Sequence, residues 1–345
     1  MMKKIRNTAI ITALIMILCV FTGCGQADNE SLIQGTADYI EETYGSSFTA
    51  GDSISEWTLI MLSRAGIEAD FDGYLDSAEK YVTARYKDSE KLDRIKATEW
   101  HRTALAITAA GGDPTAFGKD KNGKPVNLVA EGTYNWKQTD KIDMQGSNAL
   151  IYALITLDSK AYEIPDGAEY TRERLVKMLL DYQGSDGAFG LSDSNSGDTD
   201  ITAMVVQALA PYKLGEAVSE DISKELRRQV EKSVDSALGY LSEAQQDSGL
   251  YMSGGDYSSE TSSQVILALC SLNIDPETDE DFIKADRTLL DGLMEYSCDD
   301  GSFAHSTEEQ SAESGDRVMS SQQAGSALTA IKMLKEERGR YFDFN

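Results

Sequence analysis

DGAFGLSDSNSGDTDITAMVVQALA, residues Asp186–Ala210, joins a glycine-rich acidic loop to a small, apolar segment of helical character. That apolar segment is one of six along the chain with the same composition. Their first residues lie about 43 to 62 positions apart, a period expected of helix-pair repeats. The six segments are Glu56–Gly66, Glu99–Gly111, Gln145–Leu157, Asp200–Tyr212, Glu260–Leu272 and Gln322–Leu334.

The chain between these segments supplies a partner for each of them. Apolar residues recur there at spacings of three and four, which indicates amphipathic helices with one face in solvent. Small residues on the repeated segments, such as Ala104, Ala153 and Ala208, allow inner helices to approach closely. Six pairs predict an all-α fold, a closed α/α toroid (α6/α6 barrel). An open solenoid is the alternative, and six repeats without an evident capping repeat favour closure.

A second pattern precedes three of the inner segments. A glycine is followed two positions later by an aromatic residue in Gly187–Phe189, Gly249–Tyr251 and Gly301–Phe303. Glycine permits a positive φ at the end of an outer helix, and the aromatic ring can then wedge between adjacent repeats. We interpret these tripeptides as structural clasps.

The N-terminus has the features of a sorting signal. A basic start, Met1–Arg6, leads into a short apolar stretch, and the sequence Phe21-Thr22-Gly23-Cys24 resembles a bacterial lipobox. We expect a signal peptide at residues 1–23, a lipidated Cys24 with a short tether through residue 33, and one toroid domain at 34–345. Two alternatives are cleavage by an ordinary signal peptidase and a thioester like that of complement-type proteins, whose glutamate is missing here.

Composition limits the partners of the chain. The 345 residues carry a formal net charge of −26, spread along the sequence, which argues against nucleic acid or an anionic membrane surface as a partner. We expect an exported monomer that touches the outer face of the plasma membrane only through its lipid. Two cysteines lie beyond the signal, and unpaired thiols are favoured over a disulfide for Cys270 and Cys298.

Particular residues carry a resemblance to a known superfamily. Gln183 and Asp186–Phe189, followed by Asp198–Ala203 and a small apolar helix, resemble the terpenoid cyclase and protein prenyltransferase α/α toroid superfamily. The turn Gly112–Pro114 and the segment Glu99–Arg102 are similar to bacterial extracytoplasmic prenyltransferase and squalene oxidase repeat lipoproteins. The resemblance covers residue 34 to the C-terminus. It implies the toroid fold and leaves the function open, since the superfamily includes cyclases, transferases and binding proteins.

The same resemblance implies a candidate acid. Class II cyclases protonate their substrate with the middle aspartate of an acidic motif, and Asp200 stands at that position here with Asp198 two residues before it. Two close carboxyl groups can share a proton, so general acid catalysis by this pair is a hypothesis. The third aspartate of the motif is replaced by Ile201. The alternative is that Asp198 or Asp200 caps the helix, and Glu56, Glu99 and Glu260 stand at similar places in other repeats.

Parallel inner helices would place those acidic residues around one mouth of the ring. Such a mouth could receive a cationic or hydroxylated ligand between apolar aromatic walls. The expected ligand-binding residues are Glu56, Trp57, Glu99, Trp100, Tyr152, Tyr257, Glu260 and Phe303.

We expect no cofactor. His101 and His305 are the only histidines and neither stands beside a suitable cysteine, which excludes a prenyltransferase-type zinc site. Oxygen ligands for calcium are present at Asp193, Asn195, Asp198 and Asp200, but the loop lacks EF-hand spacing, and a solvated loop is favoured. Three hypotheses remain: a non-catalytic module that binds a small molecule or a partner protein, a cyclase-like enzyme, and a structural module of a surface assembly.

Overall fold

The computed structural model describes residues 29–192, 197–253, 256–311 and 317–345. The expected signal peptide, Cys24, and the calcium-loop residues Asp193 and Asn195 lie outside these ranges. The first described helix starts at Asn29, so residues 29–33 belong to a helix and not to a tether, and Ile33 is buried. No helix within the described ranges has the length and apolar character needed to span a membrane.

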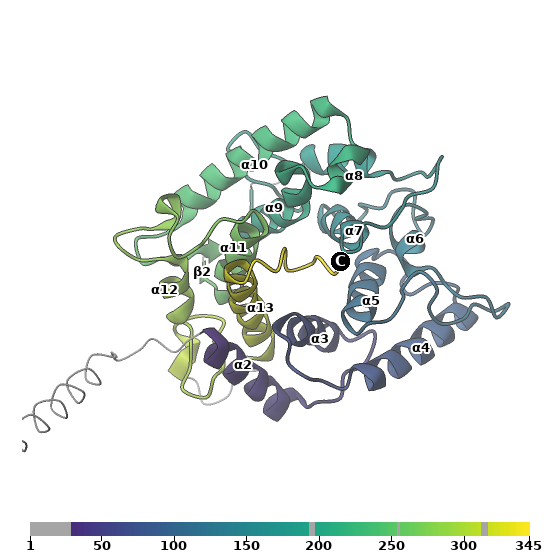
Figure 1. Cartoon of the computed structure of the whole chain (residues 1–345), viewed down its shortest axis with the longest axis horizontal. Coiled ribbons are helices and arrows are strands. Elements are labelled where there is room, and N and C mark those ends of the chain that lie inside the picture. The colour runs from purple at the N-terminus through teal and green to yellow at the C-terminus, as the bar shows by residue number, and fades with distance from the viewer. Residues whose placement is uncertain (1–28, 193–196, 254–255, 312–316) are drawn as a thin grey trace, which may run out of the picture.

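Twelve α-helices in the described residues alternate between an outer and an inner layer (Figure 1). The outer helices are α2 (Asn29–Tyr44), α4 (Phe71–Asp88), α6 (Leu128–Gly132), α8 (Arg172–Leu180), α10 (Lys224–Ala244) and α12 (Leu289–Met294). The inner helices are α3 (Ser53–Ala65), α5 (Thr98–Ala109), α7 (Asn148–Asp158), α9 (Thr199–Leu214), α11 (Ser259–Ser271) and α13 (Val318–Lys335). Three 3₁₀ turns lie at Ala217–Asp221, Glu280–Phe282 and Glu309–Ser311, and β1 (Met252–Ser253) pairs with β2 (Asp256–Tyr257) in a short hairpin before α11.

All six repeated segments lie on the inner helices, as predicted. Each inner helix contacts the next, and α13 packs against both α2 and α3, which closes the ring. Gly325 makes the close approach possible, since a Cβ there would lie 2.4 Å from Met61 Sδ and 3.1 Å from Thr36 Cγ2. The protein is a closed α/α toroid, and the open solenoid is excluded.

The glycine–aromatic tripeptides join neighbouring repeats. Gly187, Gly249 and Gly301 have φ values of 89°, 83° and 84°. A Cβ on each would lie 2.5–2.6 Å from a backbone oxygen of the following outer helix or its cap, at Ser236, Thr288 and Gly35 respectively. The rings of Phe189, Tyr251 and Phe303 are buried beside them. The clasp interpretation is confirmed, and the third clasp joins the last repeat to the first.

The C-terminal segment, residues 336–345, leaves α13 and runs into the centre of the ring (Figure 1). Arg340 forms a bidentate ion pair with Glu216, at 2.8 and 2.7 Å. The Phe344 amide donates to the Ser159 carbonyl, and the Arg64 guanidinium lies 4.8 Å from the centre of the Phe344 ring. Since these partners stand at the C-terminal ends of α3, α7 and α9, the segment covers that end of the ring.

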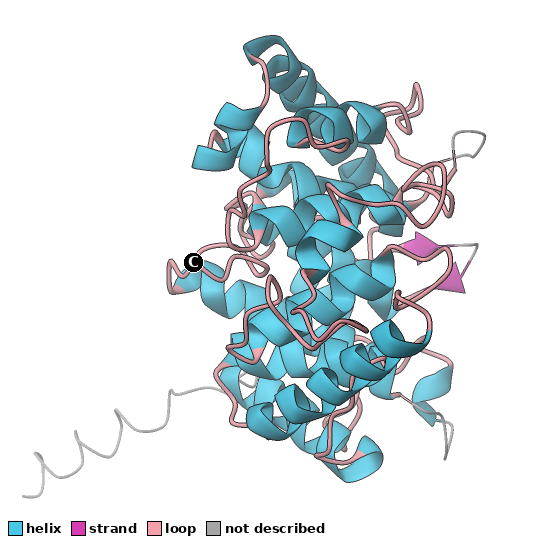
Figure 2. Cartoon of the chain, turned by 90° about the vertical axis from the view of Figure 1, so that its right-hand side faces the viewer, coloured by secondary structure: helices cyan, strands magenta, loops and turns pink. Residues whose placement is uncertain are grey.

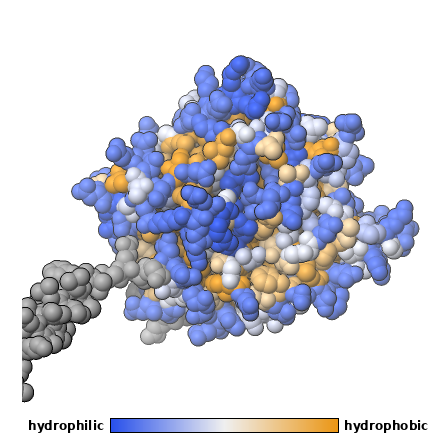
Figure 3. Space-filling model, viewed as in Figure 1, coloured by the Kyte–Doolittle hydropathy of each residue, from blue (hydrophilic) through white to orange (hydrophobic). Residues whose placement is uncertain are grey.

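The two faces of the ring therefore differ. Inner helices that each follow an outer helix run in the same direction, so their N-termini meet at one face and their C-termini at the other. In the side view of Figure 2 the C-terminus lies at one face and the β1–β2 hairpin at the opposite one. Figure 3 shows the face that carries the C-terminal segment, with hydrophilic surface over its centre.

Candidate functional site

A central cavity of about 210 Å³ lies inside the ring, between the C-terminal segment and the face where the inner helices begin. Five inner helices and the C-terminal segment line it. The lining residues are Trp57, Tyr152, Asp200, Met204, Glu260, Gln264, Leu267, Gln322, Gln323, Ser326, Tyr341 and Phe342. The structure thus brings together four of the residues expected from the sequence, namely Trp57, Tyr152, Asp200 and Glu260.

Two carboxylates belong to the wall of the cavity. Asp200 lies in the first turn of α9 and Glu260 in the first turn of α11, and these two helices pack against each other. Glu260 accepts hydrogen bonds from the hydroxyls of Ser258 at 2.9 Å and Ser320 at 2.5 Å. His305 Nδ1 lies 2.8 Å from the same carboxylate. Glu260 is therefore held in place from three sides.

Most of the acidic residues expected to cap the inner helices do not cap them. Asp198 is the N-cap of α9, and its carboxylate accepts from the Ile201 amide at 3.0 Å. The caps of α3 and α11 are Asp52 and Ser258. The capping interpretation thus holds for Asp198 and is wrong for Glu56 and Glu260.

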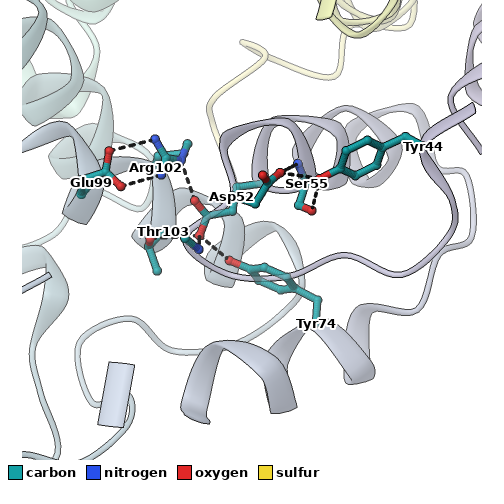
Figure 4. A network of polar contacts seen from close by, with 9 residues as sticks. Tyr44, Asp52, Ser55, Tyr74, Glu99, Arg102 and Thr103 are labelled. Carbon is teal, nitrogen blue, oxygen red and sulfur yellow. Dashed lines mark hydrogen bonds and ion pairs between the residues drawn. The ribbon is translucent and has the colours of Figure 1, made fainter. Parts of the chain in front are cut away.

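Four acidic residues were expected around the mouth of the ring, and this prediction is wrong for Glu56 and Glu99. Both carboxylates bind Arg102, Glu56 Oε2 at 2.5 Å and Glu99 Oε2 at 2.7 Å (Figure 4). Glu56 is fully buried and also accepts from the hydroxyls of Thr103 at 2.9 Å and Tyr74 at 3.1 Å. Burial raises the pKa of the Glu56 carboxyl. This network ties α3, α4 and α5 together and leaves neither carboxylate in the cavity.

Only some of the aromatic residues expected at the ligand site line the cavity. The ring of Trp57 lies 5.4 Å from that of Tyr152 and 6.3 Å from that of Phe342, centroid to centroid, at the cavity wall. Burial raises the pKa of Tyr152 to about 12, so its hydroxyl stays protonated at neutral pH. Trp100 and Phe303 are instead buried between helices, and Trp100 packs edge-on against Trp136. Tyr257 lies exposed on β2 and does not line the cavity.

Sequence reasoning missed a row of glutamines. Gln207 Nε2 donates to Gln264 Oε1 and Gln264 Nε2 donates to Gln323 Oε1, each at 2.9 Å, across α9, α11 and α13. The signal was present, since each glutamine interrupts an otherwise apolar or small-residue inner segment. A polar side chain on a buried helix requires partners, and here the partners lie on the neighbouring helices.

Tyr341 and Phe342 were also missed. The Tyr341 hydroxyl donates to Ser326 Oγ at 2.9 Å, and the two rings are 4.9 Å apart. The aromatic residues of the C-terminal segment thus form the floor of the cavity.

Nothing in the described ranges forms a group of three or more His, Cys, Asp or Glu side chains arranged to hold a metal ion. Of the two cysteines in these ranges, Cys270 is buried and Cys298 is partly exposed, and both are free thiols. Burial raises the pKa of the Cys270 thiol.

Comparison with known proteins gives structural similarity only. No family model and no curated protein matches the sequence. Several solved structures cover most of the chain, and the following three are examples. An unsaturated glucuronyl hydrolase from Bacillus sp. GL1 covers 90% of this chain and 97% of its own, at a TM-score of 0.55 and 13% identity. Protein geranylgeranyltransferase-I from Candida albicans covers 88% of this chain and 92% of its own, at a TM-score of 0.54 and 11% identity. A type II terpene cyclase from Scytonema covers 89% of this chain and 97% of its own, at a TM-score of 0.51 and 14% identity.

These similarities support the α/α toroid fold expected from the superfamily resemblance. At such low identity they show the fold alone, because this fold carries different chemistries in the three proteins.

Proposed function

We propose that the protein is a binding module that takes up a small molecule in the central cavity without chemical conversion. The observation that carries this proposal is the composition of the cavity wall, where aromatic rings, amide side chains and two carboxylates line one cavity. The C-terminal segment covers one end of the ring, and the proposed entrance for the ligand is at the other end, where the inner helices begin. A volume of about 210 Å³ is below the roughly 300–1,000 Å³ of drug-sized pockets, so the ligand is small.

The wall argues against the substrates named for two of the similar structures. The geranylgeranyltransferase was solved with geranylgeranyl diphosphate and the cyclase with a geranylgeranyl dihydroxybenzoate. A long apolar chain would displace water from the carboxylates of Asp200 and Glu260, and taking water away from a carboxylate costs free energy.

The binding proposal is tested by native mass spectrometry and thermal shift of residues 29–345 with organic cations, monosaccharides and polyprenols. At least one of these classes should bind and raise the melting temperature. Trp57→Ala should weaken that binding at least tenfold, because it removes one ring of the wall. Tyr257→Ala is the matched control, since Tyr257 is exposed outside the cavity, and it should bind as the wild type does. Failure of all three classes to bind would contradict the proposal and favour the structural interaction module.

A cyclase-like enzyme is the second candidate, and the placement of Asp200 in the cavity wall favours it. In that case Asp200 would act as the general acid. Its expected neighbour in this role, Asp198, is engaged as the helix cap. Incubation with a polyprenyl substrate decides the matter. If product forms and Asp200→Asn abolishes it at an unchanged melting temperature, the binding-only proposal is wrong.

We also propose that the protein is exported and anchored through lipid on Cys24, on the lipobox resemblance of residues 21–24. Glu30, at the start of α2, pairs with Lys332 near the end of α13 at 3.0 Å. The described chain therefore begins at the face covered by the C-terminal segment, and an anchor at Cys24 would direct the opposite face away from the bilayer. Labelled palmitate should be incorporated in cells and lost in Cys24→Ala but not in Cys298→Ala. Label retained in Cys24→Ala would contradict the anchor.

A further inference from the structure

We infer that the ligand of the central cavity is a small organic cation, such as a quaternary ammonium compound. This inference rests on the proposed binding function and adds the chemical class of the ligand. It is carried by two properties of the cavity wall: its charge and its aromatic rings.

The charged groups of the wall are all of one sign. Asp200 and Glu260 are carboxylates, and none of the described lining residues is Lys, Arg or His. The N-terminus of a helix carries only about half a positive charge. The end of α9 bears Asp198 and Asp200 and the end of α11 bears Glu260, so the carboxylates outweigh both helix dipoles. The space between them favours a positive charge and disfavours phosphates and uronates.

Three basic residues on the elements around the cavity are engaged by acidic side chains. Arg102 is bound by Glu56 and Glu99. Arg340 is bound by Glu216, behind the floor made by Tyr341 and Phe342. His305 touches Glu260 and is half exposed, so a protonated His305 would oppose the carboxylate.

The aromatic rings select the kind of cation. Trp57, Tyr152 and Phe342 form one cluster at the wall, and the face of an aromatic ring attracts a cation that lies within about 6 Å. This attraction favours organic cations, which are only weakly hydrated. An inorganic divalent ion would need several oxygen, nitrogen or sulfur ligands around one point, and the described residues offer no group of three acidic, histidine or cysteine side chains for it.

The test is isothermal titration calorimetry of residues 29–345 at pH 8 with choline, tetramethylammonium and 3,3-dimethyl-1-butanol, which has the shape of choline without its charge. Choline should bind at least tenfold more tightly than the neutral alcohol. Asp200→Asn and Glu260→Gln should each weaken choline binding about tenfold and change binding of the alcohol less than twofold. Asp256→Asn is the matched control, since Asp256 is exposed on β2 outside the cavity, and it should change neither.

The outcomes distinguish the inferred cationic ligand from the proposed binding function on which it rests. If the alcohol or a monosaccharide binds as tightly as choline, or if the two cavity variants leave choline binding unchanged, the inference is overturned and the binding function stands. If no cation, alcohol, sugar or polyprenol binds, both are overturned. The urea midpoint of each variant is measured first, and Glu260→Gln decides the matter if Asp200→Asn does not fold.

Discussion

Gly301 is one of the residues at which the last repeat meets the first. Its φ of 84° and its position against the Gly35 carbonyl leave no room for a side chain, and Thr36 Oγ1 donates to the Gly301 carbonyl at 3.4 Å. A side chain here would have to adopt a left-handed backbone conformation and displace the backbone of α2 as well.

Gly301→Ala should therefore lower the free energy of unfolding by about 2–3 kcal/mol. The measurement is urea denaturation followed by circular dichroism. Gly239→Ala is the matched control, because Gly239 is exposed within α10 and nothing lies within 4 Å of an added Cβ. That control should raise stability by roughly 0.5–1 kcal/mol. Equal effects of the two substitutions would show that the clasp does not close the ring.

The individual residues of the candidate site were predicted from the sequence only in part. The pairs Glu56–Trp57 and Glu99–Trp100 look equivalent in sequence, yet Trp57 lines the cavity and Trp100 is buried in the core. An amphipathic pattern assigns the faces of a helix only where one side is in solvent. The inner helices are buried on nearly every side, so the sequence predicts the helices but not which side chain faces the centre.

Among the elements, α5 and α6 are linked by a buried histidine. His101 Nε2 lies 2.6 Å from the Gly132 carbonyl oxygen, and burial lowers the pKa of His101 from 6.5 to about 4. The folded protein thus resists protonation of this side chain, whereas the unfolded chain accepts the proton near pH 6.5. The stabilisation is present above pH 6.5 and is lost as the pH falls toward 4.

Lowering the pH from 7 to 4 should therefore cost the wild type about 3 kcal/mol of stability through His101. His101→Gln keeps an N–H donor and does not titrate, so its stability should fall less over the same interval. Denaturation curves at pH 7, 5.5 and 4 for both proteins measure the difference. Parallel pH profiles would contradict the assignment.

The C-terminal segment is the element that the sequence did not reveal. Its ten residues have no periodic pattern, and their anchors, Glu216, Ser159 and Arg64, lie far away in the sequence. Pattern analysis detects local regularity and is blind to such a contact. The repeats, by contrast, were predicted in number and order, because each helix pair carries its own periodic signal.

Arg340→Ala should loosen this segment. It removes the buried partner of Glu216 and should cost about 1–2 kcal/mol, less than for a fully buried pair because Glu216 is a third exposed. Arg338→Ala is the control, since the contacts of Arg338 with Glu336 and with the Arg64 carbonyl are both exposed, and it should cost below about 0.5 kcal/mol. Thermal denaturation compares them. If Arg338→Ala costs as much as Arg340→Ala, the Glu216 pair does not anchor the segment.

For the whole molecule, closure of the ring creates the cavity. Inner helices that run in the same direction bring Asp200 and Glu260 to the same end of the ring, although 60 positions separate them in sequence. The C-terminal segment covers the other end, so the ring contains one central cavity whose charged side chains are all acidic. The fold follows from the repeats, and the chemistry follows from the few side chains that the repeats turn inward.

The most direct test of this account is a crystal structure of residues 29–345 soaked with tetramethylarsonium at pH 8. The arsenic atom marks the position of a quaternary cation by its anomalous scattering. We expect a peak inside the cavity, within about 6 Å of the Trp57 ring, and a weaker peak or none in Asp200→Asn. An empty cavity, with arsenic only on the acidic outer surface, would contradict the account.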